Sequence, residues 1–262
     1  MIYNNIHLVY FSPTHSSAKI AYAIAEGMGA TSMSESDLTY DAPDMEEHID
    51  DELTIVAVPV YGGRVPDTAV GRLRMFRSNG APVVPVVVYG NRDYDDALLE
   101  LKDLCQELGF VPVAAAAFIG EHSFSRREMP VAEGRPDESD LEKAAEFGKT
   151  VSDRLRAVSC LTDLAELKVK GNFPYKEKKP SAPMAPVVDE SLCTQCEYCI
   201  DACPTHAISL SENGTVSDPA LCIKCCACVK ECPEGARTFD TPFTAILYKN
   251  FSARKEPESF LA

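Results

Sequence analysis

Two stretches of sequence, CTQCEYCIDACP at 193–204 and CIKCCACVKECP at 222–233, decide the fold of the C-terminal part of the chain. Each reads C-x2-C-x2-C-x3-C-P, and the offset that relates Cys193 to Cys222 holds for every later cysteine of the pattern. Eight of the 11 cysteines in the sequence occupy these repeated positions. A repeat with one fixed period indicates an internal duplication of a small metal-binding unit.

The spacing of these cysteines indicates iron–sulfur chemistry. Three thiolates that are each separated by two other residues can wrap three corners of a cubane cluster, and the fourth, before the proline, can serve the other cluster. The alternatives are zinc, which usually takes pairs of C-x2-C, and disulfides, which are rare where thiols stay reduced. A cluster with four cysteine ligands has no open coordination site, so it moves single electrons.

The repeat resembles bacterial-type ferredoxins with two [4Fe–4S] clusters. This resemblance implies that one cluster is held by Cys193, Cys196, Cys199 and Cys232, and the other by Cys222, Cys225, Cys228 and Cys203. The repeat gives no role to Cys105, Cys160 or Cys226, which we expect to be packing residues.

The N-terminal part of the chain, up to position 160, alternates between strand-like and helix-like segments. Apolar runs predict strands at 6–10, 53–60, 82–89 and 111–119, with a further short strand at 32–38. Helical spacing predicts helices at 16–29, 67–77, 94–108 and 137–158, the last with Asp137 as N-cap. Solid apolar strands are buried on both faces, so the pattern predicts an α/β fold with a doubly wound parallel sheet.

The composition divides the chain into four regions. Residues 1–165 form the predicted sheet domain, 166–186 a Lys- and Pro-rich linker, 187–240 a small α+β two-cluster domain, and 241–262 a C-terminal tail. Their net charges are −13, +3, −6 and +1 in that order.

Three unusual loops follow strands of the predicted sheet, at the edge where such folds bind ligands. The first, Phe11 to Ser17, carries four hydroxyl residues before a helix, which suits a phosphate, although an ordinary Ser/Thr cap is the alternative. The second, residues 59–66, has two glycines that let a flat ligand approach, and Tyr61 offers a stacking face. The third, residues 89–96, adds Tyr94.

Together the three loops resemble those of the flavodoxin family, which implies a five-stranded sheet of order 2-1-3-4-5 and bound FMN. The phosphate loop of that family has a glycine where this chain has His15, whose imidazole is expected either to donate to the phosphate or to be solvated. The resemblance implies these FMN-binding residues: Ser12, Thr14, His15, Ser16, Ser17, Val60, Tyr61, Gly62, Gly63, Arg64, Tyr89, Gly90, Asn91, Arg92 and Tyr94.

Over nearly its full length the chain resembles flavodoxin–ferredoxin fusion proteins. The resemblance extends to GEHSFS at 120–125, GRPDESDL at 134–141 and RKEPESFL at 254–261. It implies an FMN domain joined to a two-cluster domain. His122, in the loop after the fifth predicted strand, is expected to make a structural hydrogen bond or to approach the flavin.

The net charge, the first residues and the length of the apolar runs indicate which partners and which location to expect. A net charge of −15 argues against nucleic acid as a partner. The first residues lack the features of a signal peptide, and no apolar run is long enough for a membrane span, so we expect a cytoplasmic protein. Ten acidic residues and no basic ones lie between Lys19 and Arg64, which indicates either a solvated face or a docking surface for a basic redox partner.

These features predict an electron-transfer protein that passes single electrons through two [4Fe–4S] clusters to or from FMN. The alternative is a ferredoxin-dependent reductase, an FMN/iron–sulfur oxidoreductase in which a small-molecule electron acceptor binds over the flavin. A roomy pocket above one flavin face, lined from residues 120–130, would favour the reductase.

Overall fold

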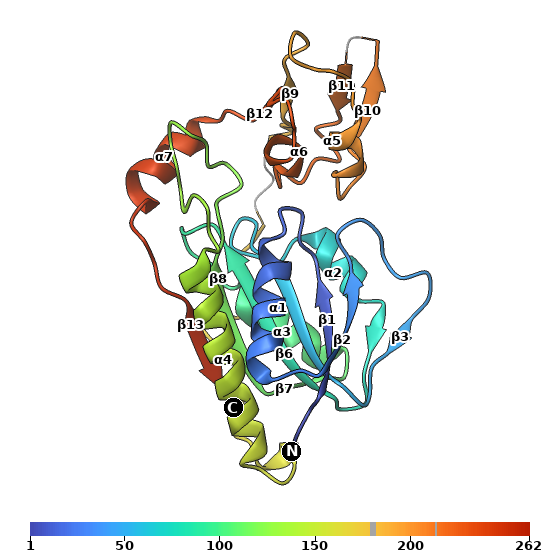
Figure 1. Cartoon of the computed structure of the whole chain (residues 1–262), viewed down its shortest axis with the longest axis vertical. Coiled ribbons are helices and arrows are strands. Elements are labelled where there is room, and N and C mark those ends of the chain that lie inside the picture. Colours follow the sequence, from blue (N-terminus) through green and yellow to red (C-terminus); the bar gives the residue numbers. More distant parts are fainter. Residues whose placement is uncertain (179–181, 213) are drawn as a thin grey trace.

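The computed structural model describes residues 1–178, 182–212 and 214–262. Its larger part is a sheet of order β13-β8-β6-β4-β1-β2, with β7 paired to β6 (Figure 1). The path consists of β13 (Glu258–Leu261), β8 (Ala114–Ile119), β6 (Pro82–Tyr89), β4 (Leu53–Pro59), β1 (Asn5–Tyr10) and β2 (Ser32–Asp37), and β7 covers Val111–Pro112.

Five parallel strands in the order β2-β1-β4-β6-β8 confirm the predicted doubly wound, flavodoxin-like sheet. Every residue of β6 and β8 is buried, as expected for strands covered on both faces. The carboxyl ends of β1, β4 and β6 therefore meet at one edge, where the three predicted ligand loops begin.

Four helices cover the sheet. On one face, α1 (Ser16–Met28) and α4 (Glu138–Arg156) form a core with Ile6, Ile55 and Val86. On the other face lie α2 (Asp67–Leu73) and α3 (Ala97–Glu107). Glycine lets α1 and α4 touch closely, because a Cβ on Gly148 would lie 2.0 Å from the carbonyl oxygen of Ile24.

Three predicted boundaries change for structural reasons. The helix predicted over 67–77 ends at Leu73, because Phe76–Arg77 forms β5 beside β3 (Glu47–His48). The helix predicted from residue 94 begins at Ala97, since Tyr94 is buried in the core. The strand predicted over 111–119 is divided into β7 and β8.

The C-terminal tail adds structure that the sequence did not predict. It forms α7 (Pro242–Phe251) and then β13, which pairs antiparallel with β8 and extends the five-stranded sheet at its edge. Ion pairs hold the returning chain on α4, including Arg254 with Asp137 at 2.6 Å and Lys143 with Glu256. The tail strand therefore belongs to the first domain (Figure 1).

The described part of the predicted linker is fixed to the sheet domain. The Tyr175 hydroxyl donates to Asp103 at 2.6 Å, and the backbone N–H of Lys176 donates to Asp96 at 2.6 Å. Lys178 reaches Asp67 at 2.5 Å. Positions 179–181 of that linker lie outside the described residues.

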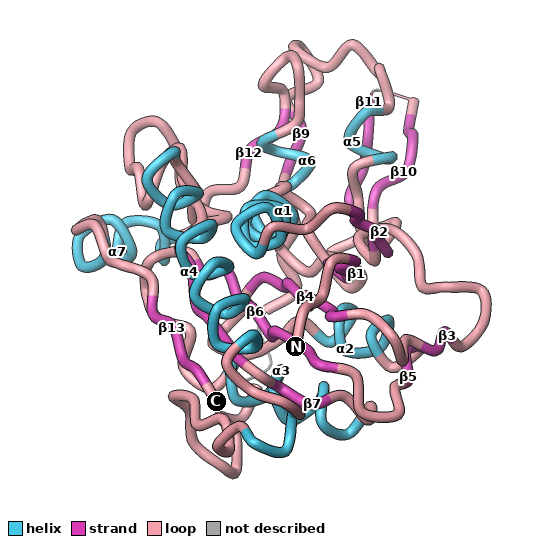
Figure 2. Tube along the Cα trace, turned by 60° about the horizontal axis from the view of Figure 1, so that its bottom comes forward, coloured by secondary structure: helices cyan, strands magenta, loops and turns pink. Residues whose placement is uncertain are grey.

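The small domain contains two strand pairs and two short helices among its described residues. Its elements are β9 (Val187–Val188), α5 (Tyr198–Asp201), β10 (Ile208–Ser211), β11 (Gly214–Ser217), α6 (Ala227–Lys230) and β12 (Arg237–Thr238). They lie beyond the carboxyl edge of the parallel strands in both views (Figure 1 and Figure 2). Because the linker and the tail are both anchored on the sheet domain, the small domain is held at each of its two chain connections.

Replacement of Arg135 by Met should strongly destabilise the sheet domain. The Arg135 guanidinium and the Asp140 carboxylate form a buried two-point pair, and the Arg135 side chain also donates to the carbonyl of Lys255 in the tail. Removing one partner leaves a buried charge, so we expect a loss of about 3 kcal/mol or more in the free energy of unfolding.

Urea denaturation measures this loss, and Arg156→Met is the matched control. Arg156 makes an exposed pair with Asp153 at 3.5 Å, so its replacement should cost less than about 1 kcal/mol. Equal losses in the two variants would contradict the assigned role of Arg135.

Candidate functional site

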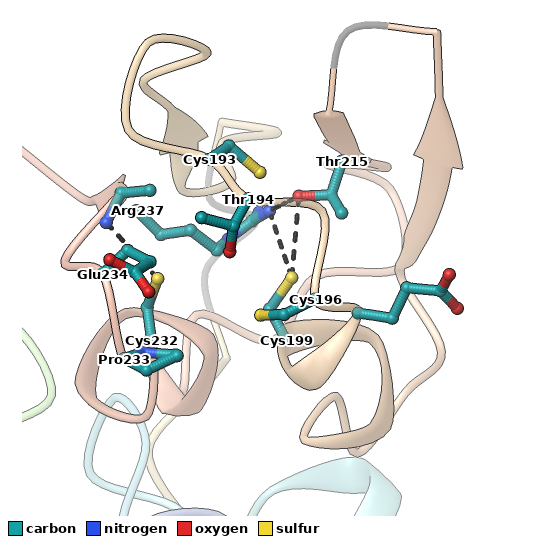
Figure 3. Close-up of a pocket in the computed structure, with 11 residues that line it drawn as sticks. Cys193, Thr194, Cys196, Cys199, Thr215, Cys232, Pro233, Glu234 and Arg237 are labelled. Carbon is teal, nitrogen blue, oxygen red and sulfur yellow. Dashed lines mark hydrogen bonds between the residues drawn. The ribbon is translucent and has the colours of Figure 1, made fainter.

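Four cysteines of the small domain surround one cavity. Cys193, Cys196, Cys199 and Cys232 line it together with Thr215 and Arg237 from neighbouring strands (Figure 3). The set combines three cysteines of the first repeat with the last cysteine of the second, as in the predicted first cluster. Cys196 is exposed and Cys199 is buried, so this cavity lies close to the surface.

The other four repeated cysteines line a second cavity. Cys203, Cys222, Cys225 and Cys228 surround it, and Ile223 and Cys226 also contribute to its wall. Three of the four are buried. In both cavities the thiols surround a space rather than one point: among the described residues, no three His, Cys, Asp or Glu side chains are placed to hold a single metal ion.

Hydrogen-bond donors are directed at the sulfur atoms. The backbone N–H of Ala207 donates to Cys203 Sγ at 3.2 Å, and that of Ala236 donates to Cys232 Sγ at 3.3 Å. The two alanines occupy equivalent positions in the two copies, so the repeat preserves the contact. Such bonds stabilise thiolate ligands and tune cluster potentials. Thiol-only donor sets with N–H groups on sulfur fit iron–sulfur clusters.

Burial changes the acidity of the second set. It raises the pKa of Cys228 to about 11, although the charge of Arg237 opposes the shift, and it raises the pKa of Cys225 further. Both groups are therefore thiols at neutral pH in the free chain. Cluster binding must displace these protons, because only thiolates ligate iron.

The first loop leads into the start of α1. His15 precedes the helix with φ 62°, in the left-handed region that glycine adopts most easily. The Ser12 hydroxyl accepts from the backbone N–H of Ala18 at 3.1 Å. The His15 imidazole faces the Glu231 carboxylate of the small domain at 3.7 Å, a contact that neither sequence alternative included.

The second loop lies against the small domain. Gly62 and Gly63 have positive φ, and a Cβ on Gly63 would lie 2.0 Å from an oxygen of Asp95 in the third loop. Burial raises the pKa of the Tyr61 hydroxyl well above its usual value, and the thiols of Cys225 and Cys226 raise it further. Ile223, which lines the second cavity, packs against the core of the sheet domain.

The structure does not bring all of the predicted flavin residues together. Tyr94 is fully buried and donates to Glu258 of β13 at 2.8 Å, and Tyr89 packs on it at 5.3 Å between ring centroids. Their rings are core residues and offer no face to a ligand. Asn91 is also buried, and its amide donates to the carbonyls of Phe251 and Ala253 at 2.6 and 2.8 Å.

Two arginines predicted for the flavin site have other partners. The Arg64 guanidinium makes a two-point pair with Glu100 on α3, with both bonds at 2.7 Å, and donates to the carbonyl of Lys176. Arg92 pairs with Asp95 within the third loop. Arg64 therefore fastens the second loop and the linker to α3 rather than pointing into the ligand edge.

His122 occupies the edge beside the third loop. A Cβ on Gly90 would lie 2.5 Å from the His122 ring, so glycine is required there. The backbone N–H of Phe124 donates to His122 Nδ1 at 3.0 Å, which leaves the proton of the neutral ring on Nε2. Burial lowers the pKa of His122 to about 4, with Lys230 and Arg92 adding to the shift, so the ring is neutral at pH 7.

The residues that join the two domains have no signal in the sequence. Arg72 donates to the carbonyls of Leu38 and Thr39 in the sheet domain and to Pro204 in the small domain, at 2.9, 2.6 and 2.8 Å. Lys230 donates to Glu121 at 2.5 Å. A side chain that donates to backbone carbonyls leaves no pattern in the sequence, because every residue has a backbone carbonyl.

Much of the acidic run between Lys19 and Arg64 is paired inside its own domain. Glu35 accepts from the hydroxyls of Tyr10 and Tyr22, and Asp50 accepts from Asn79. Within the described residues, no helix has the length and apolar character needed to cross a bilayer.

Comparisons with known proteins agree with this architecture. Residues 186–209 and 215–238 each match the family model described as a 4Fe-4S binding domain, which indicates two [4Fe–4S] clusters, as predicted. No curated protein matches the chain at a significant level.

The sheet domain is similar to solved flavodoxins only at low identity. A flavodoxin from the domain Archaea is 13% identical over 58% of this chain and 99% of its own, with a TM-score of 0.39. The flavodoxin of Streptococcus pneumoniae TIGR4 is 18% identical over 57% of this chain and 99% of its own, with a TM-score of 0.41. The strand order, and not these values, establishes the flavodoxin-like fold. The chain therefore combines a flavodoxin-like domain with two 4Fe-4S binding domains, as the resemblance to flavodoxin–ferredoxin fusion proteins implied.

Proposed function

We propose that this protein transfers single electrons between its two [4Fe–4S] clusters and an FMN bound at the carboxyl edge of the sheet. The observation that carries the proposal is the position of the small domain. Ile223, which lines its second cysteine cavity, packs against the core of the sheet domain, and Pro204, next to Cys203 of that cavity, accepts from Arg72 at 2.8 Å. The two cofactors would then be neighbours in one chain.

Fixed contacts support direct exchange between the sites. His15, Arg72 and Glu121 of the sheet domain each contact the small domain. Because both chain connections of the small domain are anchored as well, no large domain movement is needed to bring the clusters to the flavin edge.

Fewer residues than the sequence predicted are placed to bind a flavin nucleotide, but those that remain fit one. Backbone N–H groups at the start of α1 and the hydroxyls of Ser12, Thr14, Ser16 and Ser17 would bind the phosphate, assisted by the helix dipole. Gly62, beside which a Cβ would meet nothing within 4 Å, would let the backbone approach the ring, and Tyr61 would contact it. Bound FMN supplies the capacity to store two electrons that arrive singly. His122 would offer its Nε2–H to an acceptor at this edge.

Charge suggests the nature of the external partner. Glu197 and Glu234 line the first cavity, which lies close to the surface. The small domain carries −6 overall, and its three basic side chains, Lys224, Lys230 and Arg237, all donate to partners within the protein. A redox protein with a basic docking face, steered by this field, is the expected partner in the cytoplasm.

A second candidate function is reduction of a small oxidised molecule at the flavin. It is favoured by a cavity of about 290 Å³ beside the third loop. The cavity is lined by Asn91, Pro130, Ala132, Glu133, Arg135, Tyr248, Ser252 and Arg254. Of residues 120–130, which were expected to line a substrate pocket, Pro130 alone lines this cavity.

Protein purified without oxygen should contain about eight iron atoms and eight acid-labile sulfides per chain. Elemental analysis and the cluster absorbance measure both quantities. Two zinc atoms per chain in place of iron would overturn the cluster assignment.

The triple variant Ser12→Ala, Thr14→Ala, Ser17→Ala should bind FMN much more weakly. Each lost hydrogen bond to a charged phosphate is worth about 1.5–3 kcal/mol, so the Kd should rise by at least about tenfold per group that contacts it. Quenching of FMN fluorescence on titration of the flavin-free protein measures the Kd.

Ser159→Ala, in a segment after α4, is the control for that series. Circular dichroism of the triple variant must match the parent, because Ser12 also accepts a hydrogen bond from the first turn of α1. Unchanged FMN affinity in a folded triple variant would contradict the phosphate site.

Anaerobic stopped-flow distinguishes the two candidate functions. With reduced ferredoxin as donor, an electron carrier should lose cluster absorbance before flavin absorbance. Rapid reduction of the flavin by NAD(P)H ahead of the clusters, followed by turnover with a small oxidant, would favour the reductase instead.

A further inference from the structure

The two cysteine repeats have different surroundings, and their sequences differ at the same places. Thr194, Glu197 and Tyr198 of the first repeat correspond to Ile223, Cys226 and Ala227 of the second when the two patterns are aligned on their cysteines. All three residues of the first repeat are exposed, and Tyr198 is 50% exposed. Cys226 is 2% exposed and Ala227 is fully buried.

Glu197 and Cys226 have the same backbone conformation, so the two repeats differ there only in the side chain. Glu197 has φ 63° and Cys226 has φ 59°, and each precedes the short helix of its repeat. A carboxylate faces water in one copy, and a small, weakly polar thiol is buried in the other. This substitution lets the second repeat lie against another protein surface without burying a charge.

That surface is the flavin edge of the sheet domain. Ile223 packs against the core formed by α2, α3 and the sheet. Pro204, which follows Cys203 of the second set, accepts from Arg72 at 2.8 Å.

We propose that the two clusters work in a fixed order, with the second cluster as the partner of the flavin and the first as the outer port. Cys226, on the buried side of the second repeat, belongs to the contact between that repeat and the sheet domain, which gives Cys226 a role outside cluster ligation. This inference rests on the proposed function and specifies its route.

Each step transfers one electron from a donor that is oxidised to an acceptor that is reduced. A reduced one-electron donor protein is oxidised as it reduces the first cluster, which is oxidised in turn as it reduces the second. The second cluster then passes its electron to FMN. Two such passages, with two protons from water, reduce the flavin fully. Transfers in the opposite direction follow the same order.

Spin relaxation of the half-reduced flavin tests the order, because a nearby reduced cluster accelerates that relaxation and a distant one does so far less. Cys225→Ser removes a ligand of the second cluster, and Cys196→Ser is the matched change in the first. We expect most of the relaxation enhancement to be lost in Cys225→Ser and kept in Cys196→Ser. The reverse result would overturn the proposed order.

Non-ligand variants test the contact itself. Cys226→Glu, which installs the residue of the first repeat, should slow flavin reduction by the clusters, with iron and FMN contents unchanged. Tyr198→Leu, a change at an exposed side chain of the first repeat that does not line its cavity, should leave that internal rate unchanged. An unaltered internal rate in Cys226→Glu would overturn the role of Cys226.

If Cys226→Glu does not fold, Cys226→Ser and Tyr61→Leu provide the same rate comparison against Tyr198→Leu on the outer repeat. A protein that holds both cofactors but shows equal effects at the two repeats would refute the order alone. A parent protein without FMN or without clusters would refute the proposed function instead.

Discussion

The guanidinium of Arg72 donates three hydrogen bonds that link the two parts of the molecule. It donates to two carbonyls just after strand β2 and to the carbonyl of Pro204, which follows Cys203 of the second cavity, and it lies 5.7 Å from the centre of the Phe11 ring. A planar fork with five donors can join three acceptors in fixed directions, which an ammonium cannot do. The loops expected to bind flavin and the second cysteine cavity keep their relative positions through this contact, together with the ion pair of Lys230 and Glu121.

Stable placement matters more for a redox protein than for most two-domain proteins. Electron exchange between cofactors depends on their separation, and interfaces between domains of one chain are often mobile. Here the linker carries lysines and a tyrosine that find carboxylates on the sheet domain, and the tail returns as a strand of the first sheet. The chain is therefore anchored on the sheet domain both before and after the small domain.

Sequence patterns predicted the parts of this structure that depend on local order. Apolar runs located the parallel strands, and the cysteine spacing located both cavities with their crossed membership. Tyr94 was assigned to the ligand edge but lies in the core, because an aromatic residue in a loop after a strand looks the same in either place. Strand β13 was missed since Glu258–Leu261 has little apolar character of its own and pairs only because β8 offers an open edge. The contacts of Arg72 and Glu231 join distant segments and have no local signal.

The returning strand also has a consequence for how the protein behaves in concentrated solution. Strand β8 reads Ala-Ala-Ala-Ala-Phe-Ile, and β13 pairs along the side of it that faces away from β6. Without that cover, an apolar strand with unpaired N–H and carbonyl groups would be open to the same edge of another molecule. Strand β13 itself is short and mostly exposed, and it begins with the charged residue Glu258. By pairing with β8, the tail covers this apolar strand and leaves a strand of four residues, beginning with Glu258, as the edge of the sheet.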